Sequence, residues 1–254
     1  MSGNTARFQD LGIRALSAVV LAVVAGVAFW QGGIVVGVFV ALLSGAIGWE
    51  IARMLGAQNP LITAGLTALA VFLASLVTWE MRAPFLIAAC GIAYGTIEKQ
   101  RMLFVIAYMT TALGALSFLL ISSKLGLAWI GWLVGVVVIT DIAGYFAGRV
   151  FGGPKFWPSI SPKKTWSGTS AGWVGAAVFG GFMMGPLGAS TDIIAMSVIV
   201  SFASQMGDIF QSFVKRRVGV KDSSALIPGH GGVWDRFDGT LGAALVYWPL
   251  TFLF

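Results

Sequence analysis

The sequence predicts an all-α, polytopic integral membrane protein with about nine transmembrane helices. Of its 254 residues, 57% are hydrophobic and only 10% are charged, and the mean hydropathy is +0.89. Soluble domains carry roughly 25% charged residues, so the main solvent of this chain is lipid. We expect a single membrane domain over residues 1–254, with N-terminal helices in 1–125 and the functional motifs in 126–254.

Apolar stretches separated by short polar breaks predict the individual helices, because a helix needs about 20 mostly apolar residues to cross a bilayer. They cover residues 12–30, 33–52, 61–79, 84–97, 101–122, 127–149, 170–187, 192–213 and 239–254. The fourth stretch is the shortest. The first runs into the second after only a few residues, which predicts a helical hairpin and not a cleavable signal peptide.

Basic residues predict the orientation of these helices in the membrane. With nine spans, one side of the membrane receives only Arg82 and Lys124. The other side receives the remaining fourteen of the sixteen basic residues: Arg7, Arg14, Arg53, Lys99, Arg101, Arg149, Lys155, Lys163, Lys164, Lys215, Arg216, Arg217, Lys221 and Arg236. We therefore expect a cytoplasmic N-terminus, a C-terminus on the opposite side, and a location in the inner (cytoplasmic) membrane.

Composition also narrows the class of site. The net charge of +6 follows from topology and attraction to lipid headgroups, so we expect no nucleic-acid partner. The single cysteine, Cys90, excludes an intramolecular disulfide and a zinc cluster, and its apolar setting indicates packing. The 34 glycines favour close helix–helix contacts.

Two carboxylates inside predicted spans, Asp141 and Asp208, are functional candidates because charge is costly in lipid. At 1.5 Å per residue, each lies roughly 10–12 Å from the basic cytoplasmic end of its helix, so both can line one polar cavity. Helical spacing places further polar residues on the Asp208 stripe: Ser204, Gln211, Ser212 and Lys215.

The loop after the eighth span interleaves acids, bases and glycines. Asp235 and Asp238, three residues apart, together with Asp208 supply the oxygen ligands that Mg²⁺ prefers. Residues 228–232 (PGHGG) predict a tight turn whose amides suit a phosphate. The alternative is a solvated loop whose charges pair with one another.

These residues resemble the phosphatidate cytidylyltransferase family. The match is most specific from Ser212 to Asp238 (SFVKRRVGVKDSSALIPGHGGVWDRFD), and a second match runs from Asp141 to Trp166. The N-terminal half matches in hydropathy and in a Trp49–Glu50 pair. The sequence departs from the family pattern at Ser167 and Gln211, where the family usually has Glu.

The resemblance implies transfer of a cytidylyl group from CTP to phosphatidic acid with Mg²⁺, with or without a second cation. It implies Asp208, Asp235 and Asp238 as metal ligands, and Asp141 and Lys215 as further catalytic residues. It implies substrate and phosphate contacts from Ser161, Lys163, Lys164, Thr165, Ser204, Ser212, Arg216, Lys221, His230, Gly231, Gly232 and Arg236.

Alternatives stay open at this point. The lipid substrate can instead be a phosphorylated isoprenoid or an ether lipid, and the spans with Asp141 and Asp208 also suit an ion-coupled transporter. Trp157, Trp166 and Trp234 are candidates for stacking on cytosine, although Trp is also common as an interfacial anchor. A homodimer is neither predicted nor excluded.

Overall fold

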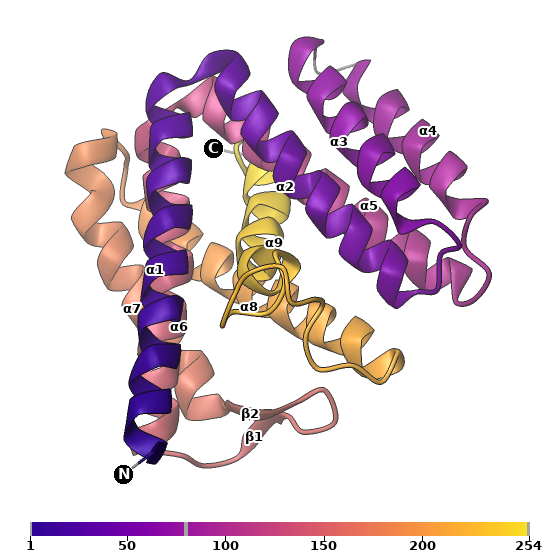
Figure 1. The fold of residues 1–254 in the computed structure, drawn as a ribbon. Coiled ribbons are helices and arrows are strands. Elements are labelled where there is room, and N and C mark those ends of the chain that lie inside the picture. The colour runs from indigo at the N-terminus through magenta and orange to yellow at the C-terminus, as the bar shows by residue number, and fades with distance from the viewer. Residues whose placement is uncertain (1, 79–80, 253–254) are drawn as a thin grey trace. The chain divides into compact units, whose positions relative to one another are not determined.

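The computed structural model describes residues 2–78 and 81–252, so Trp79 of the third expected span and residues 253–254 of the ninth lie outside it. Within these ranges the chain forms helices and one small sheet (Figure 1). The helices are α1 (Ser2–Gln31), α2 (Gly33–Met54), α3 (Pro60–Leu76), α4 (Arg82–Tyr94), α5 (Arg101–Leu125), α6 (Leu127–Val150), α7 (Trp166–Leu187), α8 (Asp192–Arg217) and α9 (Trp234–Leu250). The strands are β1 (Lys155–Trp157) and β2 (Ser161–Thr165).

Each expected apolar stretch overlaps one of these helices, although α1 and α9 begin earlier than expected and α3 and α4 end earlier. Five of them, α2, α5, α6, α7 and α8, are long and apolar enough to cross a membrane by length and composition. The apolar helices α3 and α4 are shorter, as is the apolar part of α1 from Val19 to Gln31. The protein is therefore a helical membrane protein, while a count of nine crossing helices and the sides of the two termini stay predictions.

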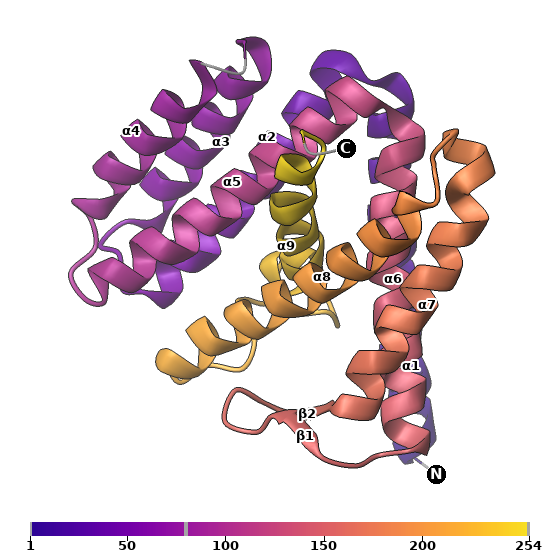
Figure 2. The same ribbon diagram turned by 180° about the vertical axis from the view of Figure 1, so that it is seen from behind.

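The region between α6 and α7 differs from the all-α expectation, because it contains an antiparallel hairpin. Lys155 pairs with Thr165 and Trp157 pairs with Ser161. The hairpin is favoured locally because aromatic and β-branched residues suit strands, and Phe156 packs edge-to-face on Trp166 with ring centroids 4.7 Å apart. Figure 2 shows it extending from the ends of α6 and α7.

The chain divides into two compact units. The first comprises Met1–Ala112 and Val218–Phe237. In it, α2 packs on α3 and α3 packs on α4. Asn59 caps α3 by accepting a hydrogen bond from the Leu61 amide, with Pro60 in the first turn. The buried Thr67 hydroxyl contacts the Tyr108 hydroxyl at 3.1 Å, which links α3 to α5.

The second unit comprises Leu113–Arg217 and Asp238–Phe254. Here α7 contacts both α6 and α8, and α6 also contacts α8 (Figure 2). Polar pairs tie these helices together: Trp132 Nε1 donates to Ser197 Oγ at 3.0 Å, and Thr140 Oγ1 donates to Ser201 Oγ at 2.7 Å. Because a buried polar group must find a partner, these pairs fix the register of α6 against α8.

Glycines bring α8 and α9 together backbone to backbone. A Cβ atom at Gly207 would collide with the carbonyl oxygen of Asp238 and would lie 3.2 Å from the Cα atom of Gly242. Small residues at such a crossing let two helices approach closely without a hydrophobic driving force. The crossing therefore places Asp238 and Gly242 of α9 beside Gly207 of α8, the neighbour of Asp208 in the sequence.

Replacing Gly207 with alanine is expected to lower the thermal stability of the purified protein, because the added methyl group meets backbone atoms that cannot rotate away. Overpacking of this kind costs about 1–3 kcal/mol. Gly91→Ala in α4 is the matched control, since a Cβ there has nothing within 4 Å. Equal melting temperatures for the two variants in detergent would contradict the close crossing.

Candidate functional site

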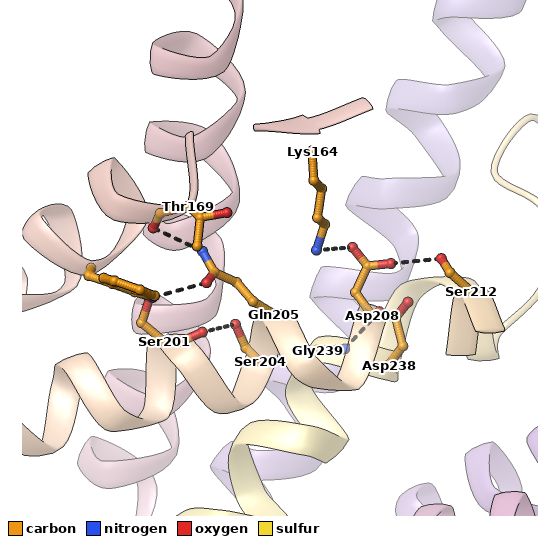
Figure 3. A network of polar contacts seen from close by, with 10 residues as sticks. Lys164, Thr169, Ser201, Ser204, Gln205, Asp208, Ser212, Asp238 and Gly239 are labelled. Carbon is orange, nitrogen blue, oxygen red and sulfur yellow. Dashed lines mark hydrogen bonds and ion pairs between the residues drawn. The ribbon is translucent and has the colours of Figure 1, made fainter. Parts of the chain in front are cut away.

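Asp208 is the centre of a polar cluster in the second unit (Figure 3). The Lys164 ammonium of β2 lies 2.5 Å from Asp208 Oδ2, and Ser212, one turn further along α8, donates to Oδ1 at 3.3 Å. The side chain of Asp208 is 37% exposed and that of Lys164 is 24% exposed. The carboxylate is therefore held by a cation and a hydroxyl, yet it remains accessible to solvent.

Asp238, one turn after the start of α9, lies next to Asp208, as Figure 3 shows. Asp208, Lys215 and Asp141 all lie close enough to Asp238 to influence it electrostatically. The Gly239 amide donates to Asp238 Oδ1 at 2.7 Å. Lys215 is buried and Asp141 is exposed. The structure thus brings together Asp141, Asp208, Asp238 and Lys215, four of the five predicted catalytic residues.

Two adjacent carboxylates are a donor set that fits Mg²⁺, because a divalent cation relieves their repulsion and takes oxygen ligands. Mg²⁺ commonly uses one or two carboxylates and fills its other positions with water and substrate phosphate. Within residues 2–78 and 81–252, no three Asp, Glu, His or Cys side chains gather into a ready-made metal site. The three-aspartate set that includes Asp235 stays a prediction.

The polar stripe of α8 continues from Asp208 toward the N-terminal end of the helix. Gln205 accepts from Trp173 Nε1 at 3.0 Å and donates to the Thr169 carbonyl at 3.2 Å, both on α7 (Figure 3). Ser204 is 2% exposed and donates to the Ser201 carbonyl at 3.0 Å. In this conformation the Ser204 hydroxyl therefore binds a carbonyl of its own helix, whereas the family resemblance implied a substrate contact.

The hairpin presents the predicted lysines on strand β2. Lys163 is exposed, Lys164 turns toward Asp208, and Ser161 is half-buried at the start of the strand. Thr165 is buried and caps α7, accepting from the Gly168 amide at 3.2 Å. Ser167, one of the departures from the family pattern, donates to the Gly152 carbonyl at 2.5 Å. Thr165 and Ser167 therefore anchor the hairpin to its neighbouring helices.

In the first unit, the predicted tight turn is confirmed. The His230 amide donates to the Ile227 carbonyl at 2.9 Å, with Pro228 and Gly229 between them. Gly229 has a φ of +73°, as the third position of a type II turn requires. Arg236 donates twice to the His230 carbonyl, at 3.0 and 2.8 Å, and the His230 ring contacts Ser17 Oγ at 2.8 Å. Arg236 therefore braces the turn.

Asp235 is bound to this same loop. Its Oδ2 atom accepts from the Gly232 amide at 2.9 Å, from the Ser223 amide at 2.9 Å and from the Ser223 hydroxyl at 3.0 Å. The Gly232 and His230 amides are thus engaged within the chain, whereas the sequence predicted exposed amides for a phosphate. Gly231, the third predicted contact of the turn, has a φ of +81°. Lys221 here and Arg216 of the second unit have exposed side chains.

Sequence reasoning gave no role to Glu50, which is fully buried in α2. Its carboxylate accepts four hydrogen bonds, from Ser223, Ser224, Val233 and Trp234. The signal was present, because Glu50 is the only acid in the expected span 33–52, and the rule that selected Asp141 and Asp208 applies to it equally.

The three tryptophans proposed to stack on a base differ in how exposed their side chains are. Trp157 is 44% exposed and Trp166 is 49% exposed, so both rings are accessible. Trp234 is 2% exposed and packs inside the first unit. The suggestion that Trp234 stacks on an incoming base is therefore wrong for this conformation, because the first turn of α9 is folded inward by its contacts with α2.

Comparison with known proteins places these features in a family context. The model of the cytidylyltransferase family matches residues 12–254. A phosphatidate cytidylyltransferase of Brucella suis biovar 1 (strain 1330) is 43% identical over 166 residues, which cover 63% of this chain and 61% of the relative. One of Helicobacter pylori (strain ATCC 700392 / 26695) is 35% identical over 162 residues, covering 63% and 60%. The alignments thus span about three fifths of each relative's length.

Thr165→Ala is expected to destabilise the protein by about 1 kcal/mol, the usual loss for an N-cap, because the Gly168 amide loses its acceptor. Thr165→Ser keeps a hydroxyl at the same place and should retain most of that stability. Thermal unfolding of both variants in detergent tests the capping role. Identical melting temperatures for Thr165→Ala and the wild type would leave only the predicted phosphate contact for this residue.

Proposed function

The chain belongs to the cytidylyltransferase family, and from this premise we propose that it transfers a cytidylyl group from CTP to phosphatidic acid. The products are CDP-diacylglycerol and pyrophosphate. One observation carries the proposal most directly: Asp208 and Asp238 lie side by side with Lys164 and Lys215 around them. Paired carboxylates among fixed cations suit a reaction between two phosphate-bearing substrates. The names of the relatives agree with it.

The chemistry needs no attacking side chain. An oxygen of the lipid phosphate forms a bond to the α-phosphorus of CTP, and the bond from that phosphorus to the bridging oxygen of the β-phosphate breaks. Pyrophosphate leaves with the electron pair of that bond. The role left to the protein is to hold two anions in line and to offset their charge, which falls to Lys164, Lys215 and the exposed Lys163.

Asp208 and Asp238 would hold Mg²⁺, which when bound supplies positive charge to the phosphates, and Asp235 and Asp141 are the further candidates to support it. Lys164 has two uses in this scheme. Its ammonium pairs with Asp208 Oδ2, the same atom that a cation would take. With a cation held by Asp208, Lys164 would be available to bind a substrate phosphate.

We propose further that the site faces the cytoplasm from the inner membrane. The support is the uneven distribution of basic residues and the position of Lys163 and Lys164 on the hairpin between α6 and α7. A lipid substrate stays in the membrane, whereas CTP arrives from solution. A cluster at the headgroup level of one leaflet can meet both substrates.

Asp208→Asn is expected to abolish transfer of radiolabelled cytidylyl groups from CTP to phosphatidic acid by purified protein with Mg²⁺. Loss of a residue that only supports a metal ligand costs about 10- to 100-fold, so loss of the ligand itself should cost at least that. The matched control is Asp192→Asn at the opposite end of the same helix, where the side chain accepts from Ser190 and touches none of the cluster.

Three results would contradict the proposal: an inactive wild type, full turnover by Asp208→Asn, or equal losses in the two variants. The same assay with a polyprenyl phosphate in place of phosphatidic acid tests the lipid class. Preferential transfer to the isoprenoid would keep the chemistry and overturn the substrate.

Lys164→Met is expected to raise the KM for CTP about tenfold or more, because a charge-assisted hydrogen bond to phosphate contributes about 1.5–3 kcal/mol. Lys99→Met, which removes an exposed lysine between α4 and α5, is the control. Initial rates at varied CTP concentration give both constants. If Lys164→Met left KM unchanged and lowered only the melting temperature, the lysine would serve the Asp208 ion pair alone.

A further inference from the structure

We propose that Glu50 is a positioning residue: it fixes the loop from Ser223 to Trp234 on helix α2 and thereby sets the orientation of Asp235 for the reaction. The inference rests on the proposed function. It concerns only the first unit, in which α2 and residues 218–237 belong to one compact body. The loop is the orange-yellow segment that leads into α9 in Figure 1.

The first observation is the way in which one carboxylate holds both ends of the loop. Glu50 Oε1 accepts from the Ser224 hydroxyl at 2.5 Å and from the Val233 amide at 2.8 Å. Oε2 accepts from the Ser223 hydroxyl at 3.0 Å and from the Trp234 amide at 2.8 Å. Each oxygen therefore binds one donor from the beginning of the loop and one from its end.

The second observation is that Glu50 acts as the cap of helix α9. The amides at the start of a helix have no partner within it, and a nearby negative charge is favourable there. Val233 and Trp234 supply two such amides, and their acceptor comes from α2, more than 180 positions away in the sequence. The starting point of α9 is thus set by another helix and not by a local Ser, Thr, Asn or Asp.

The third observation links Glu50 to Asp235. The Ser223 hydroxyl lies 3.0 Å from Glu50 Oε2 and 3.0 Å from Asp235 Oδ2. A hydroxyl has one proton, so the two carboxylates share a single donor. The backbone amide of Ser223 also donates a hydrogen bond to Asp235. The position of the Asp235 carboxylate therefore depends on where Glu50 holds Ser223.

Gly232 supplies independent support, because the backbone approaches Glu50 more closely than any side chain would permit. A Cβ atom at this position would collide with the Ser223 hydroxyl and with Glu50 Oε1, and would lie 2.8 Å from the Glu50 Cδ atom. Since Glu50 is fully buried, its carboxylate cannot move aside. The close contact between the loop and Glu50 therefore requires a glycine at position 232.

A purely stabilising role explains this arrangement poorly. A carboxylate moved out of water carries a large desolvation cost, and replacing buried charges with apolar side chains often leaves a protein equally or more stable. In the described part of the chain, the charge of Glu50 is stabilised by hydrogen bonds and not by an ion pair. The four hydrogen bonds to Glu50 instead hold the loop in one defined conformation. Residues that orient the ligands of a metal or phosphate site need such a fixed conformation.

The test compares Glu50→Gln with Thr67→Val. Glutamine keeps the shape but replaces one acceptor oxygen with an amide NH₂ group that faces other donors, whereas Thr67→Val removes a buried hydroxyl of the same unit that does not touch the loop. Two readouts are needed in detergent-purified protein: hydrogen exchange of peptides covering 222–236, and the Mg²⁺ concentration that gives half-maximal cytidylyl transfer.

For Glu50→Gln we expect faster exchange at Val233 and Trp234 with unchanged exchange in α3 and α4, and a rise of about tenfold or more in the half-saturating Mg²⁺ concentration. Thr67→Val should change neither readout. Gly232→Ala, which perturbs the same contact from the loop side, should reproduce the Glu50→Gln pattern. If Glu50→Gln does not fold, Ser224→Ala removes one of the four bonds and should give the same pattern at smaller size.

The outcomes separate the two proposals. If the wild type transfers no cytidylyl group, the proposed function fails, and so does the catalytic part of this inference, while hydrogen exchange still decides whether Glu50 fixes the loop. If the wild type is active and Glu50→Gln keeps its half-saturating Mg²⁺ concentration within twofold, or if exchange rises equally throughout the unit, Glu50 is structural only and the inference is overturned.

Discussion

The constraint on which this structure depends is the cost of placing carboxylates in a chain whose surroundings are mostly apolar. An acid removed from water must find cations or hydrogen-bond donors. The protein meets this need in two ways: Asp208 is held by Lys164 and Ser212 at a partly accessible place, and Glu50 is enclosed by four donors. An accessible acid such as Asp208 can bind a ligand. An enclosed acid such as Glu50 instead fixes the conformation of the backbone that donates to it.

The same small and polar residues that complete these sites also hold the helices together. Lipid gives apolar helices little reason to associate, so glycine contacts and interhelical hydrogen bonds must supply specificity. Gly207 lets α9 approach α8, and this contact brings Asp238 to Asp208. Further along α8, Ser197, Ser201 and Gln205 bind partners on α6 and α7. Helix α8 therefore contacts both neighbouring helices and also carries Asp208, the acid proposed to hold the cation.

Much of this was predictable from sequence, for physical reasons that also explain the failures. Apolar length determines helices in a lipid solvent, so the expected stretches matched the observed helices closely. The rule that acids inside spans are functional candidates selected Asp141 and Asp208, and their roles stay predictions. The inward position of Trp234 depends on a tertiary contact with Glu50, which local patterns do not record. The β-hairpin and the engaged amides of His230 and Gly232 are local pairings, but apolar periodicity and a glycine-rich turn do not specify them. Glu50 could have been selected as the only acid of its expected span, but its bonding partners lie more than 170 positions away, so its contacts could not be predicted locally.

The attachment of residues 218–237 to the N-terminal unit bears on how this protein can be dissected and engineered. The most recognisable motif lies in the C-terminal half, which invites the design of a shortened catalytic fragment. Such a fragment would lack the acid that shapes its own signature loop, because that acid resides on the second helix. The N-terminal helices therefore do more than anchor the chain in the membrane. Exchanging them between homologues would require exchanging the loop at the same time, because Glu50 and the loop bind each other.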